Sequence, residues 1–245
     1  MENEKSDLTF GIHPVLEAFE AGKVIEKLFL QNGMQGPNVE KIKKLANEAG
    51  TAINQVPVFK LNKLTRKNHQ GVLAIGSPIE YQSISEVIQS TYEKGEDPFI
   101  LMLDRITDVR NIGAIARSAD AFGIHAIVVP QKGTALINSE AMKSSAGALN
   151  HVPVCREQYL DDTIRELKDL GLTIIACTEK TDDVLSDLKI TGPRAVIMGS
   201  EEDGISPKYL KMADHKAKIE MSGNVGSLNV SVAAGVVLYH LSTKK

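Results

Sequence analysis

The sequence predicts an α/β protein built on a parallel sheet, with a second and smaller α/β domain at the N-terminus. After residue 99, short apolar runs alternate with segments of helical periodicity, a pattern typical of a parallel sheet covered on both faces. The stretch 77–98 contains two prolines and many polar residues, which favours a connector. A chain of 245 residues, 42% of them hydrophobic, suits one medium and one small domain. We therefore expect domains at 1–78 and 99–245, with 79–98 as a linker.

The N-terminal segment has enough alternation for a small α/β unit. Its pattern predicts helices over 14–21 and 39–49 and a strand over 27–30. Shorter strands are expected near Val56 and over 71–75. In the larger domain the predicted strands are 100–103, 126–129, 173–177 and 195–198. Because ligands of parallel sheets bind where loops leave the carboxyl ends of the strands, these loops are the places to search for chemistry.

Composition excludes several classes of protein. The formal net charge is −3, and no apolar run or leader pattern indicates a membrane span or a signal peptide, so we expect a cytoplasmic protein with no membrane partner. No glycine is followed by another two positions later, so the dinucleotide fingerprint is absent, and the one Gly-Lys pair lacks the P-loop glycine. Two distant cysteines and six scattered histidines predict neither a disulfide framework nor a metal site.

The loop after the strand ending at Leu103 opens an amphipathic helix. Asn111 is placed to cap it, and the apolar positions that follow form one core-facing stripe. Gly113 and Arg117 are four apart, which predicts open space at the glycine with the arginine pointing toward it, an arrangement suited to an anion. The alternative is a surface arginine paired with Asp120.

Two more loops carry polar groups in unusual density. In GSEEDG, residues 199–204, Gly199 is expected to let a ligand approach the backbone and Glu201 to hold a polar group, unless the segment is only an acidic turn. In MSGNVGSLNVSVAAG, either Ser227 or Asn229 is the expected N-cap of the last helix. Capping explains one such residue. It does not explain why four short polar residues occur so close together: Asn224, Ser227, Asn229 and Ser231.

Charge is unevenly distributed along the chain. Residues 1–78 hold 10 basic and 8 acidic side chains, whereas 79–245 hold 18 and 23. No acid occurs between Ala49 and Ile79, where four basic residues fall close together. They are Lys60, Lys63, Arg66 and Lys67. This basic segment is either a solvated turn or a patch that contacts nucleic-acid phosphates.

Taken together, NIGAIAR at 111–117, GSEEDG at 199–204 and SLNVSVA at 227–233 resemble the three motifs of the SpoU (TrmH-like) RNA 2′-O-methyltransferases of the SPOUT superfamily. The resemblance covers 99–241, including SAGAL at 145–149. The segment from FGIHPVLEAF to residue 75 is similar to the RNA-binding domain, resembling ribosomal protein L30e, of the 23S rRNA guanosine-2′-O-methyltransferase branch. Two positions depart from the family pattern: Val109 stands in place of a common proline, and Glu202 in place of a common glycine.

This resemblance implies a C-terminal trefoil knot that forms a pocket for S-adenosyl-L-methionine, and a homodimer with the last helix at its interface. It implies that Arg117 holds a phosphate and stabilises the developing alkoxide, that Asn111 and Asn229 position Arg117 and the ribose, and that Glu201 and Ser227 organise the pocket. The implied cofactor-binding residues are Gly199, Gly204, Ile219, Met221 and Leu228.

The implied substrate is RNA, with 23S rRNA or its assembly intermediate as the first expectation. Three alternatives stay open: a tRNA ribose 2′-O-methyltransferase, a noncatalytic RNA-binding ribosome-assembly factor, and a small-molecule enzyme of the α/β class.

Overall fold

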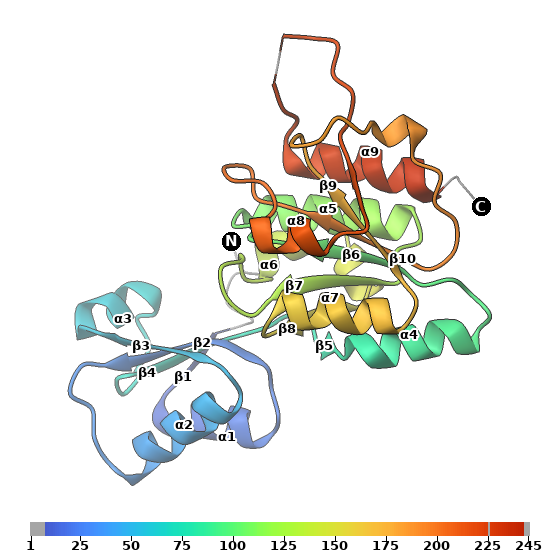
Figure 1. Cartoon of the computed structure of the whole chain (residues 1–245). Coiled ribbons are helices and arrows are strands. Elements are labelled where there is room, and N and C mark those ends of the chain that lie inside the picture. The colour runs from blue at the N-terminus through green and yellow to red at the C-terminus, as the bar shows by residue number, and fades with distance from the viewer. Residues whose placement is uncertain (1–7, 225, 243–245) are drawn as a thin grey trace. The chain divides into compact units, whose positions relative to one another are not determined.

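The computed structural model describes residues 8–224 and 226–242, and the outer ends of the predicted domains, 1–7 and 243–245, lie outside these ranges. The chain divides into two compact units, Met1–Glu80 and Tyr81–Lys245 (Figure 1). Each unit has a sheet of its own. The prediction of a small N-terminal α/β unit followed by a larger one is therefore confirmed.

The smaller unit is a four-stranded sheet in the order β1-β4-β2-β3. The strands are β1 (Leu8–Phe10), β2 (Ile25–Gln31), β3 (Ala52–Val56) and β4 (Val72–Gly76). Strands β2 and β3 are parallel, whereas β4 runs antiparallel to both of its neighbours. Because side chains alternate across a strand, Val72 and Ala74 join one apolar cluster and Leu73 joins another.

The helices of this unit cover the two faces of its sheet. Helices α1 (Ile12–Glu20) and α2 (Pro37–Glu48) pack on the face that carries Val72. The short helix α3 (Val58–Leu64) packs on the opposite face through Leu61, which is fully buried (Figure 1). Helix α3 carries the start of the basic segment.

The larger unit holds a seven-stranded sheet in the order β11-β9-β10-β6-β7-β8-β5, and every neighbouring pair in it is parallel. The strands are β5 (Tyr81–Gln82), β6 (Phe99–Leu103), β7 (Ala126–Pro130), β8 (Val154–Glu157), β9 (Thr173–Cys177), β10 (Arg194–Met198) and β11 (His215–Ala217). The central strands β6 and β10 are buried throughout, as expected for a sheet covered on both faces.

Helices cover both faces of this sheet (Figure 1). One apolar cluster joins the sheet to α4 (Ile84–Glu93), α7 (Leu160–Asp169) and α8 (Pro207–Met212). On the other side, α5 (Val109–Ala121) contacts both α6 (Ser139–Ser144) and α9 (Val230–Ser242). Two 3₁₀ turns lie at Ala148–Asn150 and Leu185–Asp187. No helix within 8–224 or 226–242 has the length and apolarity needed to cross a membrane.

The predicted linker 79–98 is wrong. Residues 81–82 form β5, which pairs with β8, and residues 84–93 form α4. Ile84, Val87 and Ile88 recur at helical spacing and enter the core of the larger unit, so this segment is part of that unit rather than a connector. Pro78, directly before this segment, and Pro98, at its end, both lie outside the helix. The parallel α/β architecture is confirmed, and the C-terminal knot stays a prediction.

Candidate active site at the ends of strands β6 and β10

Three side chains from three distant segments meet at the carboxyl end of the central strands. Asn111 Nδ2 donates to Glu201 Oε1 at 3.1 Å, and Asn229 Nδ2 donates both to Glu201 Oε1 at 2.7 Å and to Asn111 Oδ1 at 3.1 Å. Strands β6 and β10 are neighbours in the sheet, so the loops that follow them converge. The structure thus brings together one residue from each of the three motifs that carry the family resemblance. We call these three residues the Asn–Glu–Asn cluster.

The cluster leaves one carboxylate oxygen for a ligand. Glu201 Oε1 accepts both amide hydrogen bonds, whereas Oε2 accepts none from the residues that the structure describes. Glu201 is exposed to solvent, and Asn111 is buried at 9% exposure. The two amides therefore orient the carboxylate from the protein side and leave its outer oxygen accessible.

Helix α5 begins differently from the prediction. Its N-cap is Asp108, whose carboxylate accepts a hydrogen bond from the Arg110 backbone N–H at 2.7 Å, so the predicted cap at Asn111 is wrong. Asn111 lies in the first turn instead, where its side chain turns to the Asn–Glu–Asn cluster. Val109 occupies the first helical position, which is the position that proline favours, and the helix starts there without it.

Gly113 faces a neighbouring helix rather than open space. A Cβ there would lie 2.5 Å from the Ser144 Cβ and 2.6 Å from the Ala141 carbonyl oxygen, so the glycine allows α5 to pack against α6. The predicted empty site beside Gly113 is therefore wrong. The missing side chain serves helix packing, which sequence spacing cannot distinguish from an open cavity.

The loop 199–204 folds back on itself. The backbones of Ser200 and Gly204 exchange two hydrogen bonds, at 3.2 and 3.0 Å. A Cβ on Gly199 would lie 2.1 Å from the Gly204 carbonyl carbon, and Gly204 itself has a positive φ of 70°. The close approach predicted at Gly199 exists, but the group that approaches is the loop's own backbone. This tight turn presents Glu201 at its tip.

Asn229 has two functions at the start of α9. Its Oδ1 accepts from the Ser231 backbone N–H at 3.0 Å, which makes it the N-cap that the sequence placed at either Ser227 or Asn229. The Ser231 hydroxyl donates to the same oxygen at 2.5 Å. Because both bonds fix the carbonyl end of the amide, its Nδ2 is directed at Glu201 and Asn111.

A cavity of about 550 Å³ lies beside Glu201 and Asn229. All five residues expected to bind the cofactor line it, together with Ser227: they are Gly199, Gly204, Ile219, Met221 and Leu228. Met221 and Leu228 are each 37% exposed, so they offer an apolar surface at the wall. Its size and its mixture of apolar, glycine and polar residues are those of a small-molecule site.

Cys177 also lines this cavity. Burial, with a smaller contribution from the Glu179 charge, raises the pKa of the Cys177 thiol to about 12. Burial and the Glu157 charge raise the pKa of Cys155 to about 12 as well. Both cysteines are free, so they are protonated thiols at neutral pH and not nucleophiles.

A second cavity of about 220 Å³ adjoins the first. The two share Ser200, Glu201, Glu202 and Val230, so Glu201 stands at their boundary. Asn111 and Arg105 line the second cavity only. The carboxylate is thus placed to contact ligands on both sides.

Sequence analysis missed the residues that hold this second cavity in shape. Asp104, buried at the end of β6, accepts from both the backbone N–H and the hydroxyl of Ser206 at 2.7 Å. Arg105 has a positive φ of 59° and donates to Asp203 at 2.9 Å and to the Gly204 carbonyl at 3.1 Å. The Asp-Arg pair directly after a buried strand was the signal available in the sequence.

Arg117 lies apart from the Asn–Glu–Asn cluster. It is an exposed residue on α5, and no hydrogen bond or ion pair joins its side chain to another residue of 8–224 or 226–242. The alternative pairing with Asp120 is therefore not present. Both asparagines bond to Glu201 and to each other rather than to Arg117, so the expectation that they position Arg117 and the ribose stays a prediction. Its guanidinium is accessible to a substrate anion.

The basic segment is exposed and internally braced. All four basic side chains are exposed. His69 is buried, and its Nδ1 accepts from the Gly71 N–H at 2.9 Å, so its Nε2 donates to Asn62 Oδ1 at 2.8 Å. This bond ties the end of α3 to the turn that carries Arg66 and Lys67.

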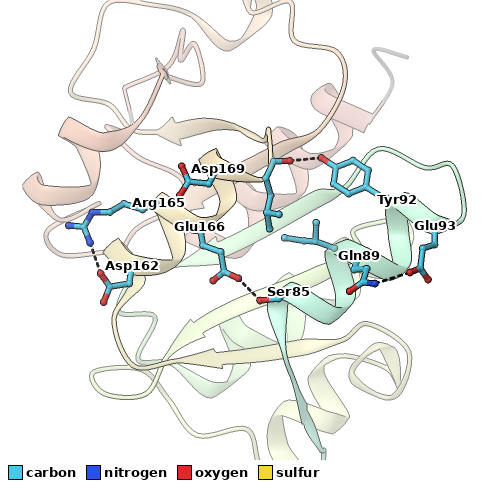
Figure 2. A pocket seen from close by; sticks show the side chains of 10 residues that line it. Ser85, Gln89, Tyr92, Glu93, Asp162, Arg165, Glu166 and Asp169 are labelled. Atoms are coloured by element: carbon cyan, nitrogen blue, oxygen red, sulfur yellow. Dashed lines mark hydrogen bonds and ion pairs between the residues drawn. The ribbon is translucent and has the colours of Figure 1, made fainter.

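A further hollow of about 820 Å³ lies between α4 and α7, away from every predicted site residue (Figure 2). Its polar lining includes Glu93, Asp162, Glu166 and Asp169, against the single cation Arg165. Arg165 is itself paired with Asp162. This acidic groove is unsuited to the phosphates of RNA.

The fold and the site together define an α/β enzyme with paired cavities at the carboxyl edge of a parallel sheet. Similarity to known protein families identifies the family to which it belongs. The model of the SpoU rRNA Methylase family matches residues 98–239, and that of the RNA 2′-O ribose methyltransferase substrate-binding domain matches residues 8–82. The chain belongs to the SpoU family of RNA methyltransferases.

Relatives of similar length support this assignment. YacO of Bacillus subtilis, described as a TrmH family tRNA/rRNA methyltransferase, is 31% identical over 99% of this chain and 98% of its own. A Staphylococcus epidermidis protein with the same description is 35% identical, over 96% and 94%.

Solved structures share the fold. The AdoMet-bound rRNA methyltransferase of Sinorhizobium meliloti matches 95% of this chain and 85% of its own, with a TM-score of 0.60 and 24% identity. The TrmH/SpoU tRNA modifying enzyme of A. aeolicus matches 65% of this chain and 83% of its own, with a TM-score of 0.55 and 27% identity.

Proposed function

We propose that the protein transfers a methyl group from S-adenosyl-L-methionine to the 2′-hydroxyl of a ribose in RNA, and that its target is a guanosine of 23S rRNA. The observation that carries this proposal is the Asn–Glu–Asn cluster at the boundary between two cavities. A methyl transfer needs a donor site and an acceptor site that meet at one point, and these cavities meet at Glu201.

The residues of the larger cavity fit S-adenosyl-L-methionine. Ile219, Met221 and Leu228 provide an apolar surface for a purine ring, and three glycines, Gly199, Gly204 and Gly226, line the wall without side chains. Ser227 and Thr178 add hydroxyls for the polar parts of the molecule. When bound, this cofactor supplies an electrophilic methyl group on a sulfonium.

The smaller cavity is the proposed place of the target ribose. There the free Oε2 of Glu201 accepts a hydrogen bond from a ribose hydroxyl, while Asn111 and Asn229 fix the carboxylate through Oε1. In-line displacement requires the attacking oxygen, the methyl carbon and the sulfur to be aligned. With Oε1 held by the two asparagines and Oε2 by the ribose, Glu201 contributes to that alignment.

Although Arg117 lines neither cavity, it is proposed to bind the phosphate next to the target ribose and, in the complex with RNA, to stabilise the alkoxide as it forms. Its exposed guanidinium has no carboxylate partner within the described residues, so its donors are available to an anion. A guanidinium has a pKa above about 12 and only donates hydrogen bonds, so the hydroxyl proton passes to phosphate or water rather than to Arg117.

Two observations favour rRNA over tRNA as the substrate. The substrate-binding model matches the N-terminal unit, and the similarity to the S. meliloti rRNA methyltransferase extends over 95% of the chain. The A. aeolicus tRNA enzyme matches only 65% of the chain. The match to the rRNA methyltransferase is thus long enough to include the N-terminal unit.

The proposed assembly is a cytoplasmic homodimer through α9. Three apolar side chains of this helix are exposed: Val232 at 52%, Val236 at 41% and Tyr239 at 59%. Helix α9 also carries Asn229 at its N-terminus, so a second copy packed on it would lie close to the site. A large exposed apolar stripe on one helix is typical of an interface.

The test is transfer of a labelled methyl group from S-adenosyl-L-methionine to unmodified 23S rRNA and, separately, to unmodified tRNA, with Arg117→Ala as the matched variant. We expect label in a 2′-O-methylated guanosine of the rRNA and a loss of transfer by orders of magnitude in Arg117→Ala, with cofactor binding retained.

Each other outcome has a defined meaning. Label in tRNA alone would keep the chemistry and overturn the substrate. Equal rates for the variant and the parent would refute the function of Arg117. Cofactor binding without transfer to either RNA would point to an assembled particle as substrate. If neither cofactor binding nor methyl transfer is detected, a noncatalytic assembly factor is favoured.

A further inference from the structure

Helix α3 exposes an aromatic ring that the core does not use. Phe59 is 54% exposed, whereas Leu61, two positions on, is fully buried against the sheet. Its neighbours Val58 and Leu64 are also exposed, at 44% and 46%. Exposed apolar area of this kind on a short helix favours a binding surface over a structural function.

One cation lies over this ring, and other basic residues stand near it in the sequence. Lys63 Nζ lies 5.8 Å from the centroid of Phe59, within the range of a cation–π contact. Lys60 and Arg66 form no ion pair with a carboxylate of the described residues, and no acid occurs in the sequence between Ala49 and Ile79. An exposed ring can stack on a flat base, and cations without a carboxylate partner can contact phosphates. Together they suit a nucleic-acid ligand.

The surface is held in a fixed shape. The His69–Asn62 hydrogen bond ties the end of α3 to the following turn, and Lys67 lies over the ring of Phe10, with its Nζ 5.3 Å from the centroid. Leu61 anchors the helix to the sheet. A ring presented on a braced element loses little conformational entropy when a ligand covers it.

We propose that Phe59 is a stacking platform for an unpaired base of the substrate RNA, with Lys60, Lys63 and Arg66 neutralising the phosphates on either side. This inference rests on the proposed function. Proteins read single-stranded RNA by stacking splayed bases on aromatic side chains, whereas the bases of a duplex are not available for stacking. The platform therefore selects an unpaired segment, such as a loop or bulge, over a helical stem.

The larger unit offers a matched aromatic residue in the opposite surroundings. Tyr159 is 58% exposed but precedes Asp161 and Asp162 at the start of α7. Its exposure is close to that of Phe59, but the nearby cations Arg165 and Lys208 are paired with these aspartates. It is the natural control for a test of the platform.

The sequence contains no tryptophan, so a single substitution introduces a unique fluorescent reporter. The full-length variant Phe59→Trp is titrated with a single-stranded oligoadenylate of about 10 nucleotides and with a duplex of the same length. We expect quenching of the indole by the single strand, little by the duplex, and none in Tyr159→Trp with either RNA. Concentrating Phe59→Trp without RNA tests for a second copy of the chain on this surface.

A second measurement separates stacking from charge. Phe59→Leu should weaken single-strand binding about tenfold, because the stacked base is lost, while leaving its salt dependence unchanged, because no cation is removed. Phe59→Tyr should restore the affinity. An unquenched indole together with an unchanged affinity in Phe59→Leu would overturn the proposal, and so would quenching by self-association alone.

Methyl transfer by the parent protein, measured in parallel, keeps the two proposals apart. Transfer that occurs normally with an unquenched indole refutes the platform and leaves the proposed function standing. Quenching with neither methyl transfer nor binding of S-adenosyl-L-methionine supports the platform and contradicts the proposed function.

Discussion

Asn229 Nδ2 donates a hydrogen bond to Glu201 Oε1 at 2.7 Å. Asn229 is the N-cap of the last helix, and Glu201 lies at the tip of a tight loop 28 residues earlier. The same amide reaches Asn111 on a third segment, 118 residues away in sequence. Because the Oδ1 of Asn229 is held by Ser231, the amide has one orientation only. This residue links the start of α9 to the carboxylate on which the proposed reaction depends.

The variant Asn229→Asp separates these two functions. Aspartate keeps the N-cap, so the free energy of unfolding should change by less than about 1 kcal/mol. It loses both Nδ2 donors and sets a second carboxylate against Glu201, so methyl transfer should fall about 10- to 100-fold, the effect of removing a hydrogen bond to a charged group. Chemical denaturation and single-turnover transfer measure the two effects.

Ser231→Ala is the control for this variant. It removes the hydroxyl from Asn229 Oδ1 but keeps the backbone donor of the cap, so transfer should stay close to that of the parent. Parent-like transfer in Asn229→Asp would show that the amide only caps the helix.

The basic segment should govern the salt dependence of RNA binding. Changing both Lys60 and Arg66 to Gln removes two exposed cations, so the slope of log affinity against log salt should become shallower by about 0.7 for each phosphate of single-stranded RNA that is no longer neutralised. Lys44→Gln on α2, at the opposite face of the sheet, should leave the slope unchanged. Equal slopes for the double variant and the parent would show that the segment is only a solvated turn.

The exposed stripe of α9 should hold the dimer. Val236→Glu places a charge in the middle of this stripe and should yield a monomer in analytical ultracentrifugation. Leu170→Glu, at a residue with 39% exposure at the end of α7, should leave the assembly of the parent. A Val236→Glu protein of unchanged mass in solution would place the interface elsewhere.

The two thiols should react slowly in the native protein. With pKa values of about 12 for Cys155 and Cys177, the reactive thiolate is scarce at neutral pH, so alkylation should be slow and should accelerate as the pH rises toward that value. Unfolding should restore ordinary reactivity. S-adenosyl-L-methionine should slow the labelling of Cys177 further, because this residue lines the larger cavity, and should leave Cys155 unaffected. Peptide mapping after iodoacetamide distinguishes them, and rapid labelling of native Cys177 at pH 7 would contradict the burial argument.

Apolar patterning was sufficient to place the main strands, whereas the three motif residues were selected by the family resemblance. Strands β6, β7, β9 and β10 are continuous apolar runs, and parallel pairing brings the loops after them to one edge. The linker error arose because polar residues and terminal prolines outweighed the helical spacing of Ile84, Val87 and Ile88. Strand β5 has only two residues, too few for any periodicity.

Details of the site depended on contacts that no local pattern encodes. Gly113 looks the same in sequence whether the space beside it is empty or filled by α6. Asp108 and Asn111 are both good capping residues, and the choice between them is made by the bonds of Asn111 to Glu201 and Asn229. Likewise, Asp104 acquires its importance only when Ser206, 102 residues later, comes beside it.

These long separations also determine when the site forms during folding. The two bonds of Asn111 span 90 and 118 residues, and a single hydrogen bond adds only about 1 kcal/mol, too little to offset the chain entropy lost on closing loops of that length. The Asn–Glu–Asn cluster therefore cannot nucleate folding, and it assembles only after pairing of β6 with β10 has brought its loops together. In refolding, catalytic activity should return no earlier than the complete parallel sheet, even if most helices have already formed.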